Sequence, residues 1–238
     1  MKKITLLFLI MVILSGCQTI NTISKSGNLS FSTKCTIPKN SIKRFYEEEK
    51  EIIRFTLKNG QKGGCKNDRR GRHSAPYWER TELKQSSFLP KNIKYEINFN
   101  VRFLKGFVGE RETFFQIHQY NKGCNAYPTI MLKFDYNSLR LDTLNVKPVY
   151  AHGHWSSDVK IKKLLTKWQN FKIIYNLKKK NVSVFLNNDL LFKDIKFGID
   201  SCGKSRIDYG IYRPGNKLRP IKTSIVDFDN IKVKKISP

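Results

Sequence analysis

The chain has 238 residues and is strongly basic, with 45 Lys and Arg against 19 Asp and Glu and a formal net charge of +26. Hydrophobic residues make up 39% of it, which excludes a chain too polar to bury a core and allows a single all-β domain. The charge favours a polyanionic partner, whether nucleic acid, glycan or anionic lipid. A solvated basic surface without such a partner is the alternative.

The N-terminus predicts export and lipidation. Residues 1–3 are a short positive region, and residues 4–14 form an apolar run too short to span a bilayer. The small residues before Cys17 resemble the lipobox of bacterial lipoproteins, which implies cleavage after residue 16 and lipid on Cys17. Gln18 in the next position favours the outer membrane. An ordinary secretory signal with an incidental cysteine is the alternative.

The remaining cysteines predict disulfides in an exported protein. An even number of them stays after Cys17: Cys35, Cys65, Cys124 and Cys202. Two disulfides are expected, and three pairings are possible. No pair has the C-x-x-C spacing of a zinc site, so neither a metal nor another cofactor is expected.

The chain divides into a signal peptide (1–16), a lipid anchor and polar tether (17–28), and one domain (29–238). Within the domain, the highly charged stretch 43–51 predicts a loop or one helical turn. The Gly- and Arg-rich stretch 60–72 predicts a loop.

Alternating apolar and polar residues predict β-strands over most of the domain. The strongest pattern is residues 93–103, and the others are 53–57, 113–118, 129–135, 139–142, 170–177, 182–186, 189–193, 206–212 and 223–234. A hairpin turn is expected at residues 187–188 and a short helix, capped by Ser157 or Asp158, at residues 157–166. Many strands with one polar face each predict an all-β fold, two antiparallel sheets packed as a sandwich or jelly roll. The polar face of a concave sheet would form a groove for a polymer.

Three short motifs in predicted strands carry the chemistry: residues 80–84 (RTELK), 116–118 (QIH) and 210–213 (GIYR). Strand residues two apart share a face, so the cations of the first motif project together, as do the amide and imidazole of the second. With the phenol of the third, they form a set suited to β-elimination from a uronic acid.

Each of these side chains can serve one need of that reaction. Arg80 can hold the sugar carboxylate with its planar fork, and Gln116 can donate a hydrogen bond to the same oxygen. His118 can accept the C5 proton. Tyr212 can protonate the leaving oxygen, or act as base once neighbouring cations favour its phenolate. Glu82 is expected to orient Arg80.

The ordered motifs resemble the three signature strands of the family-7 alginate lyases. They equally resemble the heparin lyase I and glucuronan lyase relatives, which share the jelly-roll architecture. The resemblance covers roughly residues 50–235, including the hairpin at 182–188 and the closing strand at 226–231. It implies catalytic roles for Arg80, Gln116, His118 and Tyr212.

Two positions depart from the alginate lyase pattern. Lys84 stands where those enzymes usually have a second arginine, and Arg213 after Tyr212 is closer to the heparin-lyase-like group. The substrate expected is therefore a uronic-acid glycan in general: alginate, glucuronan or a heparin-like chain. Lys84, Glu82, Arg213 and Lys133 are the candidate substrate contacts.

The sequence thus predicts a monomeric polysaccharide lyase of the cell envelope, an outer-membrane lipoprotein that cleaves the C4–O bond by β-elimination. A non-catalytic glycan-binding protein of the same fold is the main alternative. A glycoside hydrolase would need paired carboxylates, and the Glu-x-Asp-x-x-Glu strand of such enzymes is absent from the sequence. Nucleic acid is not expected as a partner because the sequence shows no recognition motif. His152, His154 and Trp155 are assigned to a surface loop.

Overall fold

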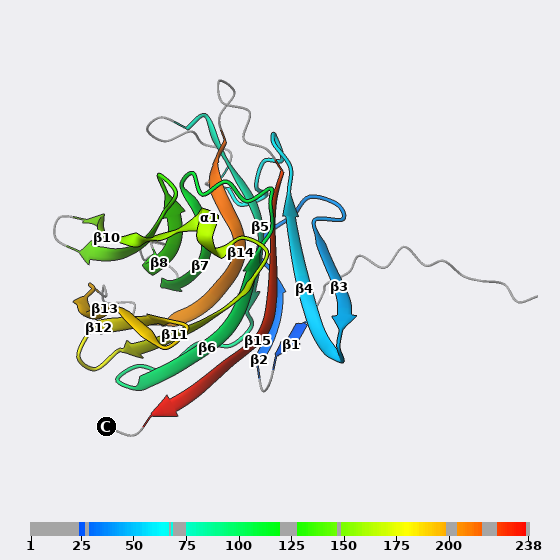
Figure 1. Ribbon diagram of the computed structural model, residues 1–238. Coiled ribbons are helices and arrows are strands. Elements are labelled where there is room, and N and C mark those ends of the chain that lie inside the picture. The colour runs from blue at the N-terminus through cyan, green and yellow to red at the C-terminus, as the bar shows by residue number, and fades with distance from the viewer. Residues whose placement is uncertain are drawn as a thin grey trace, which may run out of the picture.

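The computed structural model describes residues 24–26, 29–66, 68, 75–119, 128–146, 149–198, 204–215 and 223–236, and most of these lie in strands (Figure 1). They form two antiparallel sheets packed as a sandwich, which confirms the all-β jelly-roll fold expected from the sequence. Among the described residues, the only α-helix is the single turn α1 (Ile161–Leu164).

The first sheet has eight strands and carries all three motifs. Its order is β1 (Ser24–Ser26), β2 (Leu29–Thr33), β5 (Tyr77–Gln85), β14 (Ser205–Gly215), β7 (Glu112–Gln119), β8 (Pro128–Asp135), β9 (Ser138–Val146) and β10 (Val149–Lys160). The second sheet has seven strands, in the order β13 (Asp189–Lys196), β12 (Asn181–Leu186), β11 (Trp168–Asn176), β6 (Lys94–Phe103), β15 (Ser224–Ile236), β4 (Lys50–Leu57) and β3 (Ile42–Glu47).

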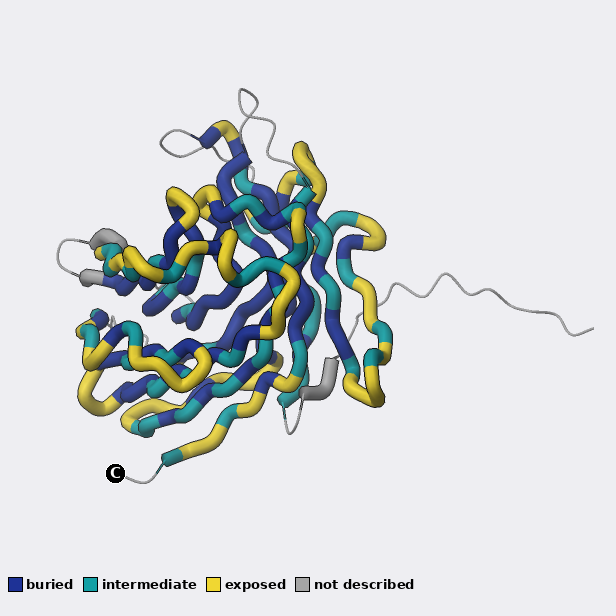
Figure 2. Tube along the Cα trace, in the orientation of Figure 1, coloured by how far each residue is buried: buried dark blue, intermediate teal, exposed yellow. Residues whose placement is uncertain are grey.

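The core lies between the sheets and is built from alternate strand residues. In β6, every second side chain from Tyr95 to Phe103 is at most 1% exposed, as the pattern of residues 93–103 predicts. Phe99 stacks on Phe115 of the opposite sheet, with ring centroids 4.7 Å apart. Exposed residues gather at the turns and along β3 (Figure 2). Burial of these aromatic faces is the main force that joins the sheets.

Two sequence predictions are wrong because local charge and capping signals were overridden by strand pairing. Residues 43–51 are not a loop or helical turn: β3 and β4 pair as a hairpin, with positive φ at both residues of the turn, Glu48 and Glu49. The helix expected at residues 157–166 is reduced to α1. Its N-cap residue is Lys160, which makes no side-chain capping bond.

Strand β10 also corrects the sequence prediction, since the segment with His152, His154 and Trp155 is an edge strand paired with β9 and not a loop. At the other edge, β1 lies inside the stretch 17–28 predicted as anchor and tether, and it pairs with β2. The turn at Asn187 and Asn188 is confirmed, and both residues have positive φ.

Candidate functional site

The three motifs meet on one face of the eight-stranded sheet, because β14 lies between β5 and β7. Tyr212 is opposite Arg80 in the register of β14 with β5, and Arg206 is opposite His118 in the register with β7. Alternate residues of these strands, such as Tyr209, point into the core. The intervening residues therefore occupy the face turned away from the core, which we call the site face.

Arg80 is held at the base of the site face by two carboxylates. Asp68 accepts from its Nε and Nη2, each at 2.8 Å, and Glu82 accepts from its Nη1. Only 6% of Arg80 is exposed. Burial alone would lower the pKa of Arg80, but Glu82 and Asp68 outweigh it and raise that pKa above its ordinary value. Arg80 is therefore a fixed cation.

Tyr212 lies directly over this cation. The guanidinium carbon of Arg80 is 3.9 Å from the centroid of the phenol ring, and Trp78 stacks against Tyr212 with centroids 5.0 Å apart. The Tyr212 ring is thus held by contacts with the Arg80 cation and with the Trp78 ring. A cation at the ring face stabilises a developing phenolate more than the neutral phenol.

Glu82 joins the first two motifs. It is fully buried, and its Oε1 accepts a 2.5 Å hydrogen bond from Gln116 Nε2 while Oε2 binds Arg80. Lys34 of the segment after β2 lies 3.7 Å from Glu82 and 2.5 Å from Asp208 of β14. Glu82 therefore orients the arginine and the amide. It lies too deep to contact a substrate itself, so the prediction that it is a substrate contact is wrong.

His118 stands beside this network. Burial lowers the pKa of His118 to about 3, and the nearby charge of Lys34 acts in the same direction, whereas Asp208 opposes both. Its Nδ1 lies 3.3 Å from the backbone oxygen of Gln119. A carbonyl only accepts, so Nδ1 carries the proton and Nε2 keeps its lone pair. The imidazole is therefore neutral at physiological pH.

A disulfide connects the two segments that bring Lys34 and Asp68 to the site. Cys35 and Cys65 are bonded, and Asp68 donates its backbone N–H to the Cys65 oxygen at 2.9 Å. Sequence reasoning missed both charged residues because neither lies in a strand pattern. Their places, next to Cys35 and three residues after Cys65, were the available signal. Of the predicted disulfides this pair is confirmed, while positions 124 and 202 lie outside the described residues.

The other predicted contacts fall in different places. Lys84 lies on β5 opposite Asp208, on the site face. Lys133 lies on β8 and forms a 2.5 Å ion pair with Asp142, and burial lowers the pKa of Lys133.

Arg213 does not belong to the site face. Its side chain points between the sheets, is 0% exposed and pairs with Glu79 at 2.6 Å and Glu112 at 3.0 Å. The prediction that it contacts the substrate is wrong, because neighbouring residues of a strand point to opposite faces and Tyr212 occupies the site face.

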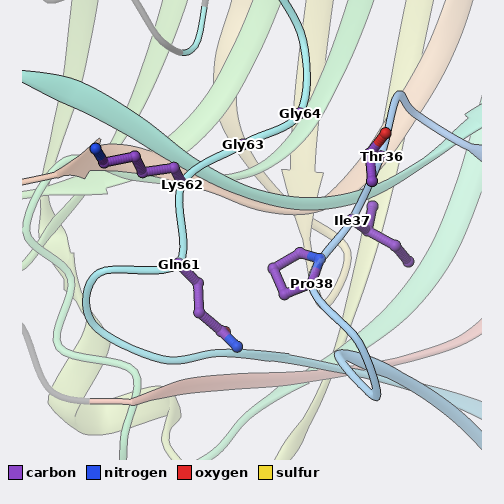
Figure 3. Close-up of a pocket in the computed structure, with 7 residues that line it drawn as sticks. All are labelled: Thr36, Ile37, Pro38, Gln61, Lys62, Gly63 and Gly64. Atoms are coloured by element: carbon purple, nitrogen blue, oxygen red, sulfur yellow. The ribbon is translucent and has the colours of Figure 1, made fainter.

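A separate hollow of about 490 Å³ lies beside the disulfide. It is lined by Thr36, Ile37, Pro38, Gln61, Lys62, Gly63 and Gly64 (Figure 3). Lys62 is its one charged side chain; it points away from Pro38 (Figure 3) and its Nζ lies 5.1 Å from the Tyr77 ring centroid. This hollow offers no chemistry. In the part of the chain that the structure describes, no cluster of three His, Cys, Asp or Glu could hold a metal ion.

Comparison with solved structures identifies the fold. Alginate lyase A1-II′, a member of polysaccharide lyase family 7, matches with a TM-score of 0.58 and 14% identity, over 84% of this chain and 86% of that one. The fold is that of the family 7 alginate lyases. Alginate lyase PA1167 from Pseudomonas aeruginosa matches with a TM-score of 0.55 and 17% identity, over 84% and 87% of the two chains.

The marine family 7 alginate lyase AlyA1 from Zobellia galactanivorans gives a TM-score of 0.54 and 15% identity, with 84% and 83% coverage. No curated protein matches the chain by sequence. Residues 1–18 match the model of the prokaryotic membrane lipoprotein lipid attachment site, which supports a membrane-anchored lipoprotein of the cell envelope. Within the described residues, no helix is long and apolar enough to cross a membrane.

Proposed function

We propose that the protein is a lyase that cleaves a uronic-acid-containing anionic polysaccharide by β-elimination. The observation that carries this proposal is the convergence of the three motifs on the site face, with Tyr212 stacked on the fixed cation Arg80. The fold shared with alginate lyases and the basic composition agree with it. The substrate class is polyuronate: alginate, glucuronan or a heparin-like chain.

In the proposed reaction, a base removes the hydrogen on C5 and its electron pair forms the C4–C5 double bond. The C4–O4 bond breaks, and O4 leaves with a proton supplied by an acid. Tyr212 is the proposed acid, with the phenolate that forms stabilised by Arg80. His118, neutral and with a lone pair on Nε2, is the proposed base. The alternative base is Tyr212 itself: as a phenolate it takes the proton from C5 and then passes that proton to O4.

The buried network uses most of the hydrogen-bond donors of Arg80, so only part of its guanidinium is left for the predicted contact with the sugar carboxylate. Its guanidinium has five N–H donors, of which three bind Asp68 and Glu82, so part of the group can still face a sugar carboxylate. Gln116 donates to Glu82 and is only 1% exposed, so its proposed part is to hold Glu82 and, through it, the guanidinium. The remaining N–H donors of Arg80, together with Lys84, would neutralise the carboxylate and stabilise the enolate-like intermediate.

Lipid on Cys17 would anchor this activity to the membrane. We propose the outer membrane as its location because Gln18 follows the cysteine, and we expect the domain to act as a monomer. The residues between the cleavage site and β2 would hold the lyase near the bilayer while the site face meets the glycan.

Mass spectrometry of the products tests the reaction type. Purified protein is incubated with size-defined oligomers of mannuronate, guluronate and glucuronate. Elimination gives a new non-reducing end that is lighter by one water than the hydrolytic product. Products that all carry that water would refute elimination and support a hydrolase.

A glycan-binding protein without catalysis is the second candidate. One observation favours it: the guanidinium of Arg80 is already paired with two internal carboxylates, so it offers less to a substrate than an unpaired arginine would. Binding of polyuronate with no cleavage by the wild-type protein would support this candidate over the lyase.

A further inference from the structure

A second cluster of aromatic and cationic side chains lies at the β10 edge of the same sheet. Trp155 of β10 is 46% exposed, and the Tyr136 side chain, in the turn after β8, is 79% exposed. Their ring centroids are 6.2 Å apart, with 33° between the planes. Two large aromatic side chains exposed together on a soluble domain indicate a contact surface.

An arginine supports this aromatic pair. The guanidinium carbon of Arg140 lies 4.8 Å from the Trp155 ring centroid. Asp142 accepts from its Nε at 2.5 Å and Asp135 from its Nη1 at 3.0 Å, so the guanidinium is fixed. Gly153 makes room for it, since a Cβ there would stand 2.3 Å from Arg140 Nε.

The strand register connects this cluster to the candidate site. A single row of opposed residues crosses six strands, and it consists of Arg80, Tyr212, Thr113, Lys133, Arg140 and Trp155. Five strand spacings of about 4.8 Å separate its ends, or roughly 24 Å. Leu139 and Leu141 flank Arg140 and are fully buried in the core, so Arg140 and Trp155 lie on the site face.

The charge around the cluster suits an anionic chain. Lys160, Lys162 and Lys163 are exposed at the end of β10 and in α1, and the backbone N–H of Ile161 binds the oxygen of Asn137 next to Tyr136. A basic rim therefore borders the aromatic pair. Sugar rings stack on aromatic faces, and the lysines attract carboxylates.

We propose that Trp155 and Tyr136, supported by Arg140, form a distal binding platform for the same anionic glycan whose cleavage is proposed at Tyr212. The inference rests on the proposed function for the identity of the glycan. Trp155 lies four strand spacings, roughly 19 Å, from Tyr212, where the bond would be cleaved, so the platform acts on long chains only. It would hold a polymer on the enzyme and favour long substrates over short oligomers.

Calorimetry tests the platform by comparing glycan binding to the wild-type and variant proteins. The ligands are a trisaccharide and a long chain, each prepared separately as mannuronate, guluronate and glucuronate. Trp155→Ala should weaken binding of the long chain about tenfold and leave the trisaccharide unchanged. Gly153→Ala, which displaces the guanidinium under Trp155, should weaken binding of the long chain less than Trp155→Ala does.

Trp168→Ala is the matched control, because Trp168 is 36% exposed and lies over Arg102 at 4.5 Å, but on the other sheet. Equal effects of the two tryptophan variants, or weakened trisaccharide binding by Trp155→Ala, would overturn the platform.

If wild type binds long chains through Trp155 without cleaving them, the platform stands and the lyase fails. If wild type cleaves and Trp155→Ala binds normally, the lyase stands and the platform fails. Absence of binding by wild type to every glycan overturns both.

Discussion

The guanidinium carbon of Arg80 lies 3.9 Å from the centroid of the Tyr212 ring, and both residues come from neighbouring strands of one sheet. Asp68 and Glu82 fix the cation from below, so the tyrosine ring rests on a charge that cannot move. This arrangement pre-organises stabilisation of a phenolate before a substrate arrives.

Removal of the Tyr212 hydroxyl tests its role. Tyr212→Phe keeps the ring over Arg80 and the stack on Trp78 but removes the proton donor. We expect turnover of polyuronate to fall by about 10²–10⁴-fold while glycan binding is retained. Steady-state kinetics and calorimetry measure the two effects. Tyr46→Phe, at a side chain 74% exposed on the other sheet, is the control. Full activity of Tyr212→Phe would exclude this tyrosine as the acid.

The disulfide is expected to support activity through the charged residues beside it. In a Cys35→Ser, Cys65→Ser double variant, the segments with Lys34 and Asp68 lose their cross-link, so Arg80 is held less firmly. We expect a lower kcat and an unchanged far-ultraviolet circular dichroism spectrum. Both are measured well below the melting temperature, because loss of the disulfide lowers the free energy of unfolding by about 2–4 kcal/mol.

Asp68→Asn separates this positioning effect from general stability, since it leaves the disulfide intact and removes only one charge. It should lower kcat more than it raises KM, and Asp68→Glu should restore part of the rate. Wild-type kinetics in both the double variant and Asp68→Asn would contradict a positioning role for the segment.

His118 makes stability depend on pH in a defined window. Its pKa is about 3 in the folded protein against 6.5 for an unperturbed histidine, so between these values the unfolded chain binds the extra proton. Its contribution is complete above pH 6.5 and is lost as pH falls toward 3. Urea unfolding at several pH values should show a shallower decline for His118→Gln, with exposed His152→Gln as control. Parallel declines for His118→Gln and wild type would contradict the half-buried, neutral imidazole.

Arg213 is expected to stabilise the fold and not to bind substrate. Arg213→Leu leaves the carboxylates of Glu79 and Glu112 without their cation between the sheets, so we expect a loss of about 3–5 kcal/mol in the free energy of unfolding. Arg44→Leu breaks a half-exposed pair with Glu51 and should cost at most about 1 kcal/mol. Comparable values for the two variants in urea unfolding would contradict this assignment.

The sequence could predict the sheets and the motif residues because both depend on local alternation. In β6 the apolar residues repeat every two positions, and the same rule placed Arg80 with Glu82 and Gln116 with His118. The alternation rule could not reveal that Asp68 forms an ion pair with Arg80, since that contact depends on how a loop folds back over 12 residues.

Arg213 shows the opposite failure. Its side chain follows the strand rule, which places it on the face opposite to Tyr212, whereas the resemblance of the motif treats Tyr212 and Arg213 as one functional unit. Strand β10 was missed because Gly153 and two histidines weaken the alternation, and its pairing with β9 comes from tertiary context.

The most direct test of the central claim is the ultraviolet absorbance of the C4–C5 double bond during incubation with alginate, glucuronan and heparin. The wild-type protein should produce a steady rise with at least one of these glycans, and the rise with Tyr212→Phe should be at least about 10²-fold slower at the same protein concentration. A flat absorbance with all three glycans, or an equal rise with Tyr212→Phe, would contradict β-elimination at this site.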